Sequence, residues 1–142
     1  MKTLWAICVL VISGSVMAST QTATLNCDEA YSTLEINQCA EDKLALAEQQ
    51  LQVYLAQSIH QNSADKALVD AINIAQKQWL LYRKTECNAV YTQWQQGTIR
   101  GVMALSCQLT ITQQRTLTLW QNYLRPMDSS TAVLPMPIVD NE

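Results

Sequence analysis

The sequence predicts an all-α fold, a small bundle of three main antiparallel helices that two disulfides staple together at one end. Three observations support this prediction. Apolar residues recur at helical spacing in three successive stretches, the loops between these stretches are short, and four cysteines remain when an apparent export signal is set aside. Outside that signal, no alternating run of apolar and polar residues indicates a β-strand.

The chain begins with an expected signal peptide at residues 1–18. Lys2 supplies a positive charge, residues 4–12 form an apolar core, and Val-Met-Ala at 16–18 has the form of a cleavage site. The core is too short to cross a bilayer, which takes about 20 helical residues. We therefore expect export to the periplasm of a bacterium, or secretion, with Cys8 removed and no membrane insertion after cleavage. An uncleaved membrane anchor is the alternative.

Four cysteines follow the signal: Cys27, Cys39, Cys87 and Cys107. An even number of cysteines in an oxidising compartment predicts two disulfides, and four cysteines can pair in three ways. All three pairings stay open at this point. The spacings lack the short pairs that are typical of a zinc site, so we expect no metal.

The first predicted helix follows a lead segment, residues 19–31. It begins at Ser32 and Glu35, which have the spacing of a capping box, where a hydroxyl and a carboxylate bind the free amide groups of a helix start. One apolar stripe then continues to about His60. The stripe consists of Ile36, Ala40, Leu44, Ala47, Leu51, Tyr54 and Leu55.

The second predicted helix starts after Asn62 and Ser63, which interrupt the first stripe and are expected to cap the new helix. It is predicted to run until Gly97, because glycine suits the left-handed conformation that often closes a helix. Its stripe consists of Leu68, Ala71, Ile72, Ala75, Trp79, Tyr82, Glu86 and Val90.

The third predicted helix ends at Pro126, so the helical domain covers residues 32–125. Residues 126–142 are predicted to form a flexible tail, because prolines and polar residues interrupt the apolar ones. Docking of a short extended segment onto the bundle, through Val133, Leu134, Ile138 and Val139, is the alternative. The stripe of the third helix consists of Val102, Leu105, Leu109, Thr112, Thr116, Leu119, Trp120 and Tyr123.

Short loops make neighbouring helices antiparallel, and this determines where the cysteines lie. Cys39 falls near the start of the first helix, Cys87 toward the end of the second and Cys107 near the start of the third. These three cysteines therefore gather at one end of the bundle, and Cys27 in the lead segment is close by. Each disulfide is expected to stabilise the fold by about 2–4 kcal/mol.

The second helix carries an unusual group of side chains at spacings of three or four, so that they lie on one side of the helix. They are Trp79, Tyr82, Arg83 and Glu86. An arginine beside aromatic rings can stack on them and can pair with Glu86 or with an acid across the bundle. We interpret the group as a structural cluster. An exposed anchor for a binding partner is the alternative.

The turn between the second and third helices is the predicted contact surface for a partner. It is polar, bracketed by glycines and held at the disulfide-bonded end of the scaffold, as functional loops often are. The candidate contact residues are Gln95, Gln96, Gly97, Thr98 and Arg100.

No pattern in the chain indicates catalysis, a cofactor or nucleic-acid binding. Removing Lys2 from the nine basic residues leaves eight against twelve acidic ones, a formal charge of −4, and no basic face is evident. His60 has no recognisable partner, and no glycine-rich phosphate loop occurs. Glu41 and Glu48 share a helix face, which we interpret as the solvated side of an amphipathic helix rather than a catalytic pair. The sequence therefore favours a binding protein over an enzyme.

Several short motifs occur along the chain in a fixed order. They are Cys27, Leu34-Glu35-Ile36-Asn37-Gln38-Cys39, Leu51 with Tyr54, Ala75-Gln76-x-x-Trp79-Leu80-x-Tyr82-Arg83-x-x-Glu86-Cys87, Gly97-Thr98, Cys107 and Thr112-x-x-Arg115-Thr116-x-x-Leu119. This pattern resembles the lysozyme-inhibitor LprI-type domain family, over roughly residues 27–124. The resemblance implies a bacterial, helical, disulfide-bonded envelope protein and, for at least one branch, inhibition of lysozyme. Two positions depart from the usual family pattern: Lys84 stands where an aspartate is frequent, and Gln96-Gly97 where two glycines are frequent.

Our hypothesis from the sequence is a periplasmic or secreted protein that binds and blocks a lysozyme-like muramidase, an enzyme that cleaves peptidoglycan. A rigid loop would enter the substrate cleft, and an acidic scaffold would favour a cationic enzyme. The target would be a host lysozyme or a toxin muramidase from competing bacteria, in which case the chain is an immunity protein. A structural or adaptor protein of the envelope, without inhibitory activity, is the alternative.

Overall fold

The structure is a computed structural model that describes residues 25–128 and 130–139. Within these residues it contains helices and no β-strand, which confirms the predicted all-α fold. The expected signal peptide lies outside the described residues. In chain order the elements are the 3₁₀ turn η1 (Cys27–Glu29), α1 (Thr33–Gln61), α2 (Lys66–Gln93), α3 (Arg100–Leu119) and the π-helical turn η2 (Trp120–Leu124).

The start of α1 is fixed by the predicted capping box. The Ser32 hydroxyl accepts a hydrogen bond from the Glu35 amide at 3.2 Å, and Glu35 Oε2 accepts one from the Ser32 amide at 2.8 Å. The hydrogen bond from the Ser32 amide stabilises the carboxylate and holds the pKa of Glu35 below its ordinary value. This prediction from the sequence is confirmed.

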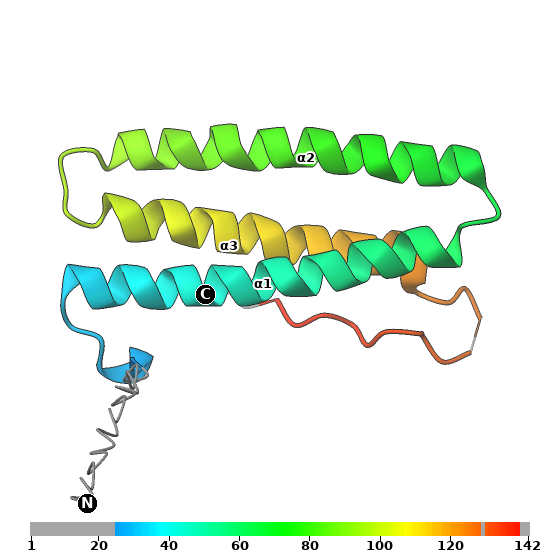
Figure 1. Cartoon of the computed structure of the whole chain (residues 1–142), viewed down its shortest axis with the longest axis horizontal. Helices are drawn as coiled ribbons and strands as arrows, with labels where there is room; N and C mark the ends of the chain where they lie inside the picture. Colours follow the sequence, from blue (N-terminus) through cyan, green and yellow to red (C-terminus); the bar gives the residue numbers. More distant parts are fainter. Residues whose placement is uncertain (1–24, 129, 140–142) are drawn as a thin grey trace, which may run out of the picture.

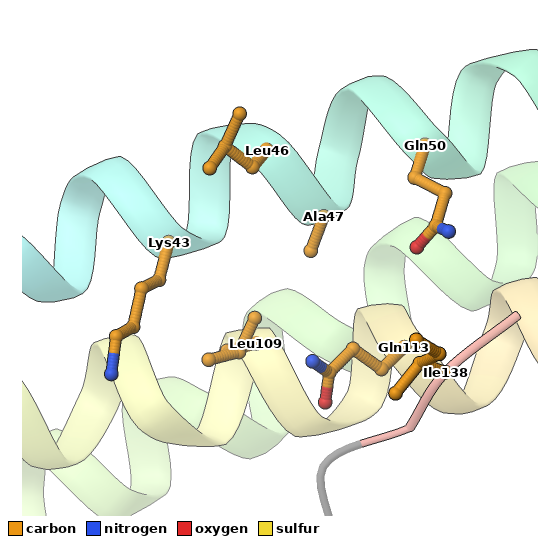
Figure 2. Close-up of a pocket in the computed structure, with 7 residues that line it drawn as sticks. All are labelled: Lys43, Leu46, Ala47, Gln50, Leu109, Gln113 and Ile138. Carbon is orange, nitrogen blue, oxygen red and sulfur yellow. The ribbon is translucent and has the colours of Figure 1, made fainter.

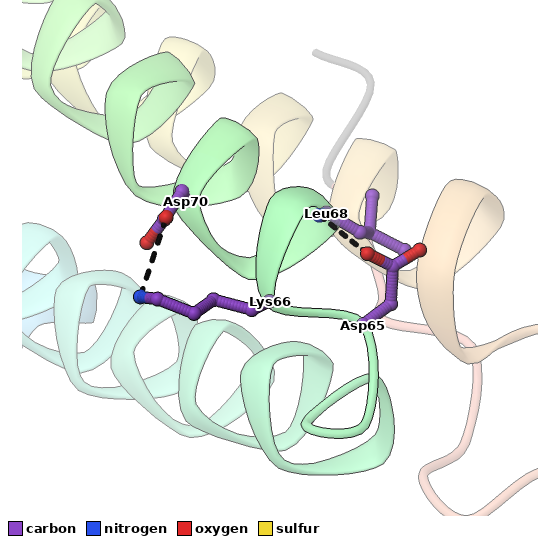
Figure 3. Close-up of polar contacts among 4 residues, drawn as sticks. All are labelled: Asp65, Lys66, Leu68 and Asp70. Atoms are coloured by element: carbon purple, nitrogen blue, oxygen red, sulfur yellow. Dashed lines mark hydrogen bonds and ion pairs between the residues drawn. The ribbon is translucent and has the colours of Figure 1, made fainter.

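The turn between α1 and α2 differs from the expectation in its capping residue. Asp65, not Asn62 or Ser63, caps α2: its Oδ1 accepts a hydrogen bond from the Leu68 amide at 3.0 Å (Figure 3). Asn62 instead closes α1, because its Nδ2 donates to the Ser58 carbonyl at 2.8 Å. The prediction of the cap at Asn62 and Ser63 was therefore wrong.

An exposed ion pair follows this cap. Lys66 Nζ lies 3.4 Å from Asp70 Oδ2, one helical turn further along α2 (Figure 3). Both side chains are largely in solvent, so the pair contributes little, about 0.3–0.5 kcal/mol. The hydrogen bond from Leu68 to Asp65 is therefore the contact that defines where α2 begins.

The end of α2 also differs from the prediction. The helix ends at Gln93, and two hydrogen-bonded turns follow it, from the Gln95 amide to the Thr92 carbonyl and from the Gly97 amide to the Trp94 carbonyl. No glycine in the described part of the chain has a positive φ. Gly97 therefore does not adopt the left-handed conformation that was expected to close the helix.

The helices are arranged around α3. Its backbone packs closely against both α1 and α2, whereas the backbones of α1 and α2 approach each other at few points. Figure 1 shows that neighbouring helices run in opposite directions, with the start of α1 and the α2–α3 loop at the same end of the molecule. Within the described residues, no helix is both long and apolar enough to span a membrane.

Both disulfides lie toward this end, as predicted. Cys27 pairs with Cys39 and so fixes η1 to the first turns of α1. Cys87 pairs with Cys107 and joins the end of α2 to the first half of α3. The structure thus selects one of the three pairings that the sequence left open.

The largest apolar cluster lies toward the other end. Leu51, Tyr54, Leu119 and Leu124 form its buried centre. Partly buried side chains surround this centre: Leu55, Trp79, Trp120, Tyr123 and Leu134. Because Leu134 comes from the segment after the helices, the core extends beyond the predicted helical domain.

That segment, residues 130–139, takes the docked arrangement that was the alternative to a flexible tail. It has no helix or strand and returns along α1 (Figure 1). The Tyr54 hydroxyl donates to the Pro135 carbonyl at 2.7 Å, and Trp120 Nε1 donates to the Leu134 carbonyl at 2.9 Å. Local composition favours a flexible tail because the prolines are visible in the sequence, whereas these distant hydrogen-bond donors are not.

Candidate functional site

The loop between α2 and α3 forms the centre of the candidate interaction surface. Arg100, the first residue of α3, folds back over it: Nη1 donates to the Gln95 carbonyl at 3.1 Å. The same guanidinium lies over the Tyr91 ring, 5.6 Å from its centroid. Arg100 thereby connects the start of α3 to the end of α2. These contacts hold the loop against the ends of α2 and α3, so that it forms a hydrogen-bonded frame and does not project freely into solvent.

A hollow of about 390 Å³ lies between this loop and the start of α1. Its lining consists of Thr33, Gln96, Gly97, Thr98 and Arg100. Four of the five contact residues expected from the sequence therefore share one concave surface, and Gln95 joins them through its bond to Arg100. Thr33 was not among the expected residues. No local pattern places it there, because it is brought in by the packing of α1 against α3.

This packing depends on a close approach between α1 and α3. A Cβ atom at Gly101 would lie 3.0 Å from Asn37 Oδ1, closer than side chains normally pack. Glycine at position 101 therefore allows the start of α3 to lie directly against α1. From the sequence alone, Gly101 is only one of the glycines that bracket the loop, and no role for Asn37 is evident.

Exposed large apolar side chains lie close in sequence to the residues that line the hollow. Tyr31, two residues before Thr33, is 93% exposed, and Leu34, directly after Thr33, is 79% exposed. Trp94 and Ile99, at the two ends of the loop, are also exposed. Exposed aromatic and aliphatic side chains around a polar centre are typical of protein-binding surfaces. Tyr31 and Leu34 were missed because they lie outside the apolar stripe and before the first helical turn is complete.

The charged residues on the chain that leads through Thr33 are mostly acidic. Arg100 is the basic residue of the loop, whereas the chain from η1 into α1 carries five carboxylates before its first base, Lys43. These carboxylates are Asp28, Glu29, Glu35, Glu41 and Asp42. The disulfide-bonded end therefore combines a polar hollow, an apolar rim and an acidic flank.

The group of side chains that was predicted to form a structural cluster on α2 separates into two parts in the structure. The Arg83 guanidinium lies over the Trp79 ring, 5.0 Å from its centroid. Its Nη1 is 2.8 Å from Glu48 Oε1 on α1 and donates to Thr112 Oγ1 on α3 at 2.7 Å. One arginine thus connects all three helices, and the acid with which it pairs is across the bundle.

Tyr82 and Glu86 take no part in this cluster, since both side chains are exposed. Because α2 packs mainly against α3, its inward stripe is narrow. The stripe runs through Ile72, Gln76, Trp79, Arg83 and Cys87, at steps of three and four residues. Tyr82 and Glu86 each fall one position before a residue of this stripe, on its solvent side.

A second arginine lies deeper in the bundle. Arg115 Nε donates to Gln76 Oε1 at 3.0 Å, which adds another polar contact between α3 and α2. Burial removes water from this guanidinium and lowers its pKa. Arg83 and Arg115 thus each donate a side-chain hydrogen bond between α2 and α3.

The fold and this surface define a class of protein: a small all-helical domain, cross-linked by disulfides, that presents a polar and aromatic surface at its cross-linked end. The chain belongs to the family described as lysozyme inhibitor LprI, whose family model matches residues 26–119. The matched region begins just before η1 and ends with α3. Comparisons with curated proteins and with solved structures gave no match.

Proposed function

We propose that this protein is exported and inhibits a peptidoglycan-cleaving muramidase by binding it through the disulfide-bonded end. The observation that carries the proposal is membership of the lysozyme inhibitor LprI family over most of the helical part of the chain. Two disulfides are consistent with an oxidising compartment such as the periplasm. The expected function is binding, without catalysis by this chain.

The α2–α3 loop is the element that would enter the substrate cleft of the enzyme. Its frame of hydrogen bonds and the nearby Cys87–Cys107 bridge restrict it before binding, so little conformational entropy is lost in the complex. The amides of Gln95 and Gln96, the Thr98 hydroxyl and the Arg100 guanidinium are hydrogen-bond donors. Muramidases of the glycoside hydrolase type use paired carboxylates, which such donors can bind.

The apolar rim would supply most of the binding energy, while the acidic flank would affect the rate of association. Tyr31, Leu34 and Trp94 are large side chains whose burial against a partner excludes water from the polar contacts. The carboxylates of η1 and α1 would attract a cationic enzyme over a distance of about 10 Å at moderate salt. Inhibition of a basic muramidase should therefore become slower to establish as ionic strength rises.

The target enzyme is either a host lysozyme or a muramidase toxin of competing bacteria, and the same surface would serve for both. The test is a titration of oxidised residues 19–142 against a chicken-type lysozyme, a goose-type lysozyme and a bacterial toxin muramidase, with cell-wall lysis as the readout. Stoichiometric inhibition of one enzyme would support the proposal and identify the target. A folded, fully oxidised chain that inhibits none of them would favour a non-inhibitory adaptor protein of the envelope.

A further inference from the structure

A groove runs between α1 and α3 on the side of the bundle where residues 130–139 lie. One hollow along it, of about 470 Å³, has Ala47 and Leu109 on its helical walls and Ile138 of the docked segment at one end (Figure 2). Lys43 lies at the other end. A second hollow of about 240 Å³ shares Lys43 and Leu109 with the first and continues toward the Cys27–Cys39 bridge. The groove therefore continues well beyond the segment that occupies it.

The contacts of the docked segment indicate what the groove recognises. Tyr54 and Trp120 each donate one side-chain hydrogen bond to a backbone carbonyl, at Pro135 and at Leu134. Leu134 packs on the apolar cluster and Pro137 is buried. Because two of these residues are prolines, the segment has few amide groups that need partners. Carbonyl acceptors on a proline-containing extended chain, bound by aromatic donors, are the chemistry of polyproline-type peptide recognition.

The charge at the far end of the groove adds a second element of specificity. Lys43 is the one basic residue that lines either hollow, and no ion pair involving it occurs in the described part of the chain. The chain itself continues after Val139 with Asp140, Asn141 and Glu142. An acidic group that follows the apolar–proline motif would complement the Lys43 charge.

We propose that the α1–α3 groove is a binding site for an extended, proline-containing peptide of a partner protein, and that the chain's own C-terminal segment occupies it as an internal competitor. The partner peptide would carry an apolar residue followed by Pro-x-Pro, as Leu134 to Pro137 do, and an acidic residue further on. This site is separate from the loop surface and does not depend on muramidase inhibition.

The internal competitor sets how strongly a partner must bind. Residues 125–133 tether the segment, and a short tether gives an effective concentration in the mM range. If the free peptide binds with a dissociation constant of about 0.1 mM, the tethered segment weakens binding of an external copy roughly tenfold. A partner peptide therefore has to exceed the affinity of the segment itself, or act after the segment has been cut.

The test uses residues 19–142 with a protease recognition sequence inserted between Ser130 and Thr131, both of which are exposed. The protein is folded, oxidised and then cleaved, so that the segment is no longer tethered. The probe is a fluorescein-labelled synthetic peptide of residues 131–142, followed by fluorescence anisotropy. We expect the cleaved protein to bind the probe at least tenfold more tightly than the uncleaved protein does.

Three variants of the cleaved protein examine the recognition. Tyr54→Phe removes the hydroxyl donor and should weaken binding about threefold to tenfold, as the loss of one hydrogen bond does. Lys43→Glu should weaken it by a similar factor, with a smaller effect at high salt. Val53→Ala, at an exposed position of α1 beside Tyr54, is the matched control and should leave binding unchanged.

A second route avoids cleavage. Leu134→Glu in the intact chain should release the segment and produce the same gain in probe binding, whereas Val133→Glu, at a 60% exposed neighbour, should not. The proposal is overturned if either released form keeps its helical circular dichroism but binds the probe no better than the parent chain. Loss of the fold in both released forms would also overturn it, because the segment would then be an integral part of the core rather than an exchangeable ligand.

Discussion

The two ends of the bundle are held together by different means. At the end with the α2–α3 loop, two disulfides connect the elements, and the buried apolar residues there are small or are cysteines, such as Ala104 and Cys87. At the other end, no disulfide occurs among the described residues, and Leu51, Tyr54, Leu119 and Leu124 form an apolar cluster. Covalent links thus replace apolar burial at the end that carries the proposed contact surface. Large side chains such as Tyr31 and Leu34 can then remain exposed.

The largest effect is expected from a cavity at the apolar end. Leu119 is fully buried in the cluster, so Leu119→Ala should lower the free energy of unfolding by about 3–5 kcal/mol. Urea unfolding followed by circular dichroism measures this loss. Affinity for the muramidase should stay within a factor of two at a temperature where the variant is folded. A large loss of affinity in the folded variant would show that the two ends are not independent.

The next effect concerns the disulfide-bonded end. Replacing both Cys87 and Cys107 by serine opens a loop of 20 residues and should lower the free energy of unfolding by about 3 kcal/mol. Unlike Leu119→Ala, this change should also weaken muramidase binding, because the loop is no longer held. Removing Cys27 and Cys39 instead releases only η1, so the bundle should lose less stability. Parental melting temperature in the Cys87→Ser, Cys107→Ser protein would contradict the role assigned to this bridge.

Two glycines at the loop allow a matched comparison. A Cβ at Gly101 meets Asn37 Oδ1 at 3.0 Å, so Gly101→Ala should destabilise the fold by about 1–3 kcal/mol. A Cβ at Gly97 meets its nearest atom at 3.6 Å, and its φ is not positive, so Gly97→Ala should change stability by less than about 1 kcal/mol. Thermal unfolding of both variants tests this difference. Equal effects would mean that α1 and α3 do not approach closely at Gly101.

A change at the loop should affect binding without affecting the fold. Thr98→Arg places a long charged side chain in the hollow and should reduce muramidase affinity at least tenfold at an unchanged melting temperature. The same substitution at Thr118, an exposed residue toward the far end of α3, is the control. Isothermal titration calorimetry compares the two. An interface that tolerates Thr98→Arg must lie elsewhere on the molecule.

The smallest expected effect is a dependence on pH at the start of α1. The pKa of Glu35 is lowered in the folded state, chiefly by the hydrogen bond from the Ser32 amide, so the ionised carboxylate favours folding. This contribution is fully present above the unfolded-state pKa, near 4.5, and is lost as pH falls through the lower folded-state value. Glu35→Gln should remove this part of the pH dependence below pH 4.5 and leave the rest. Identical acid-unfolding curves for both proteins would show that the capping carboxylate does not contribute.

Much of the fold could be predicted from local patterns. The helical stripes, the Ser32–Glu35 capping box and the gathering of cysteines at one end all follow from spacing along the chain. The disulfide pairing could not be predicted, because it depends on the packing of η1 against α1. The cap of α2 was misassigned because Asn62 and Asp65 are both good capping residues, and only the geometry shows which helix each one serves.

The surface features that could not be predicted from the sequence have a different cause. The hydrogen bond from Tyr54 to Pro135 joins residues 81 positions apart, and nothing in the composition of the tail indicates it. Whether Tyr82 and Glu86 are exposed depends on how many helices pack against α2. The spacing of apolar residues within α2 does not show that number. The loop residues that line the hollow could be grouped from the sequence because they are close together in the chain, whereas Thr33 could not, because only the tertiary fold brings it there.

The order of the disulfides has a consequence for how the protein is made. Cys27 pairs with Cys39 and Cys87 with Cys107, so each of these four cysteines bonds to its neighbour among them in sequence. If the chain is translocated from its N-terminus into an oxidising compartment, the first two cysteines emerge together, well before the second two. Oxidation in order of appearance then produces the native bonds directly. Such a chain should reach its native state with an oxidase alone and without a disulfide isomerase to reshuffle wrong pairs.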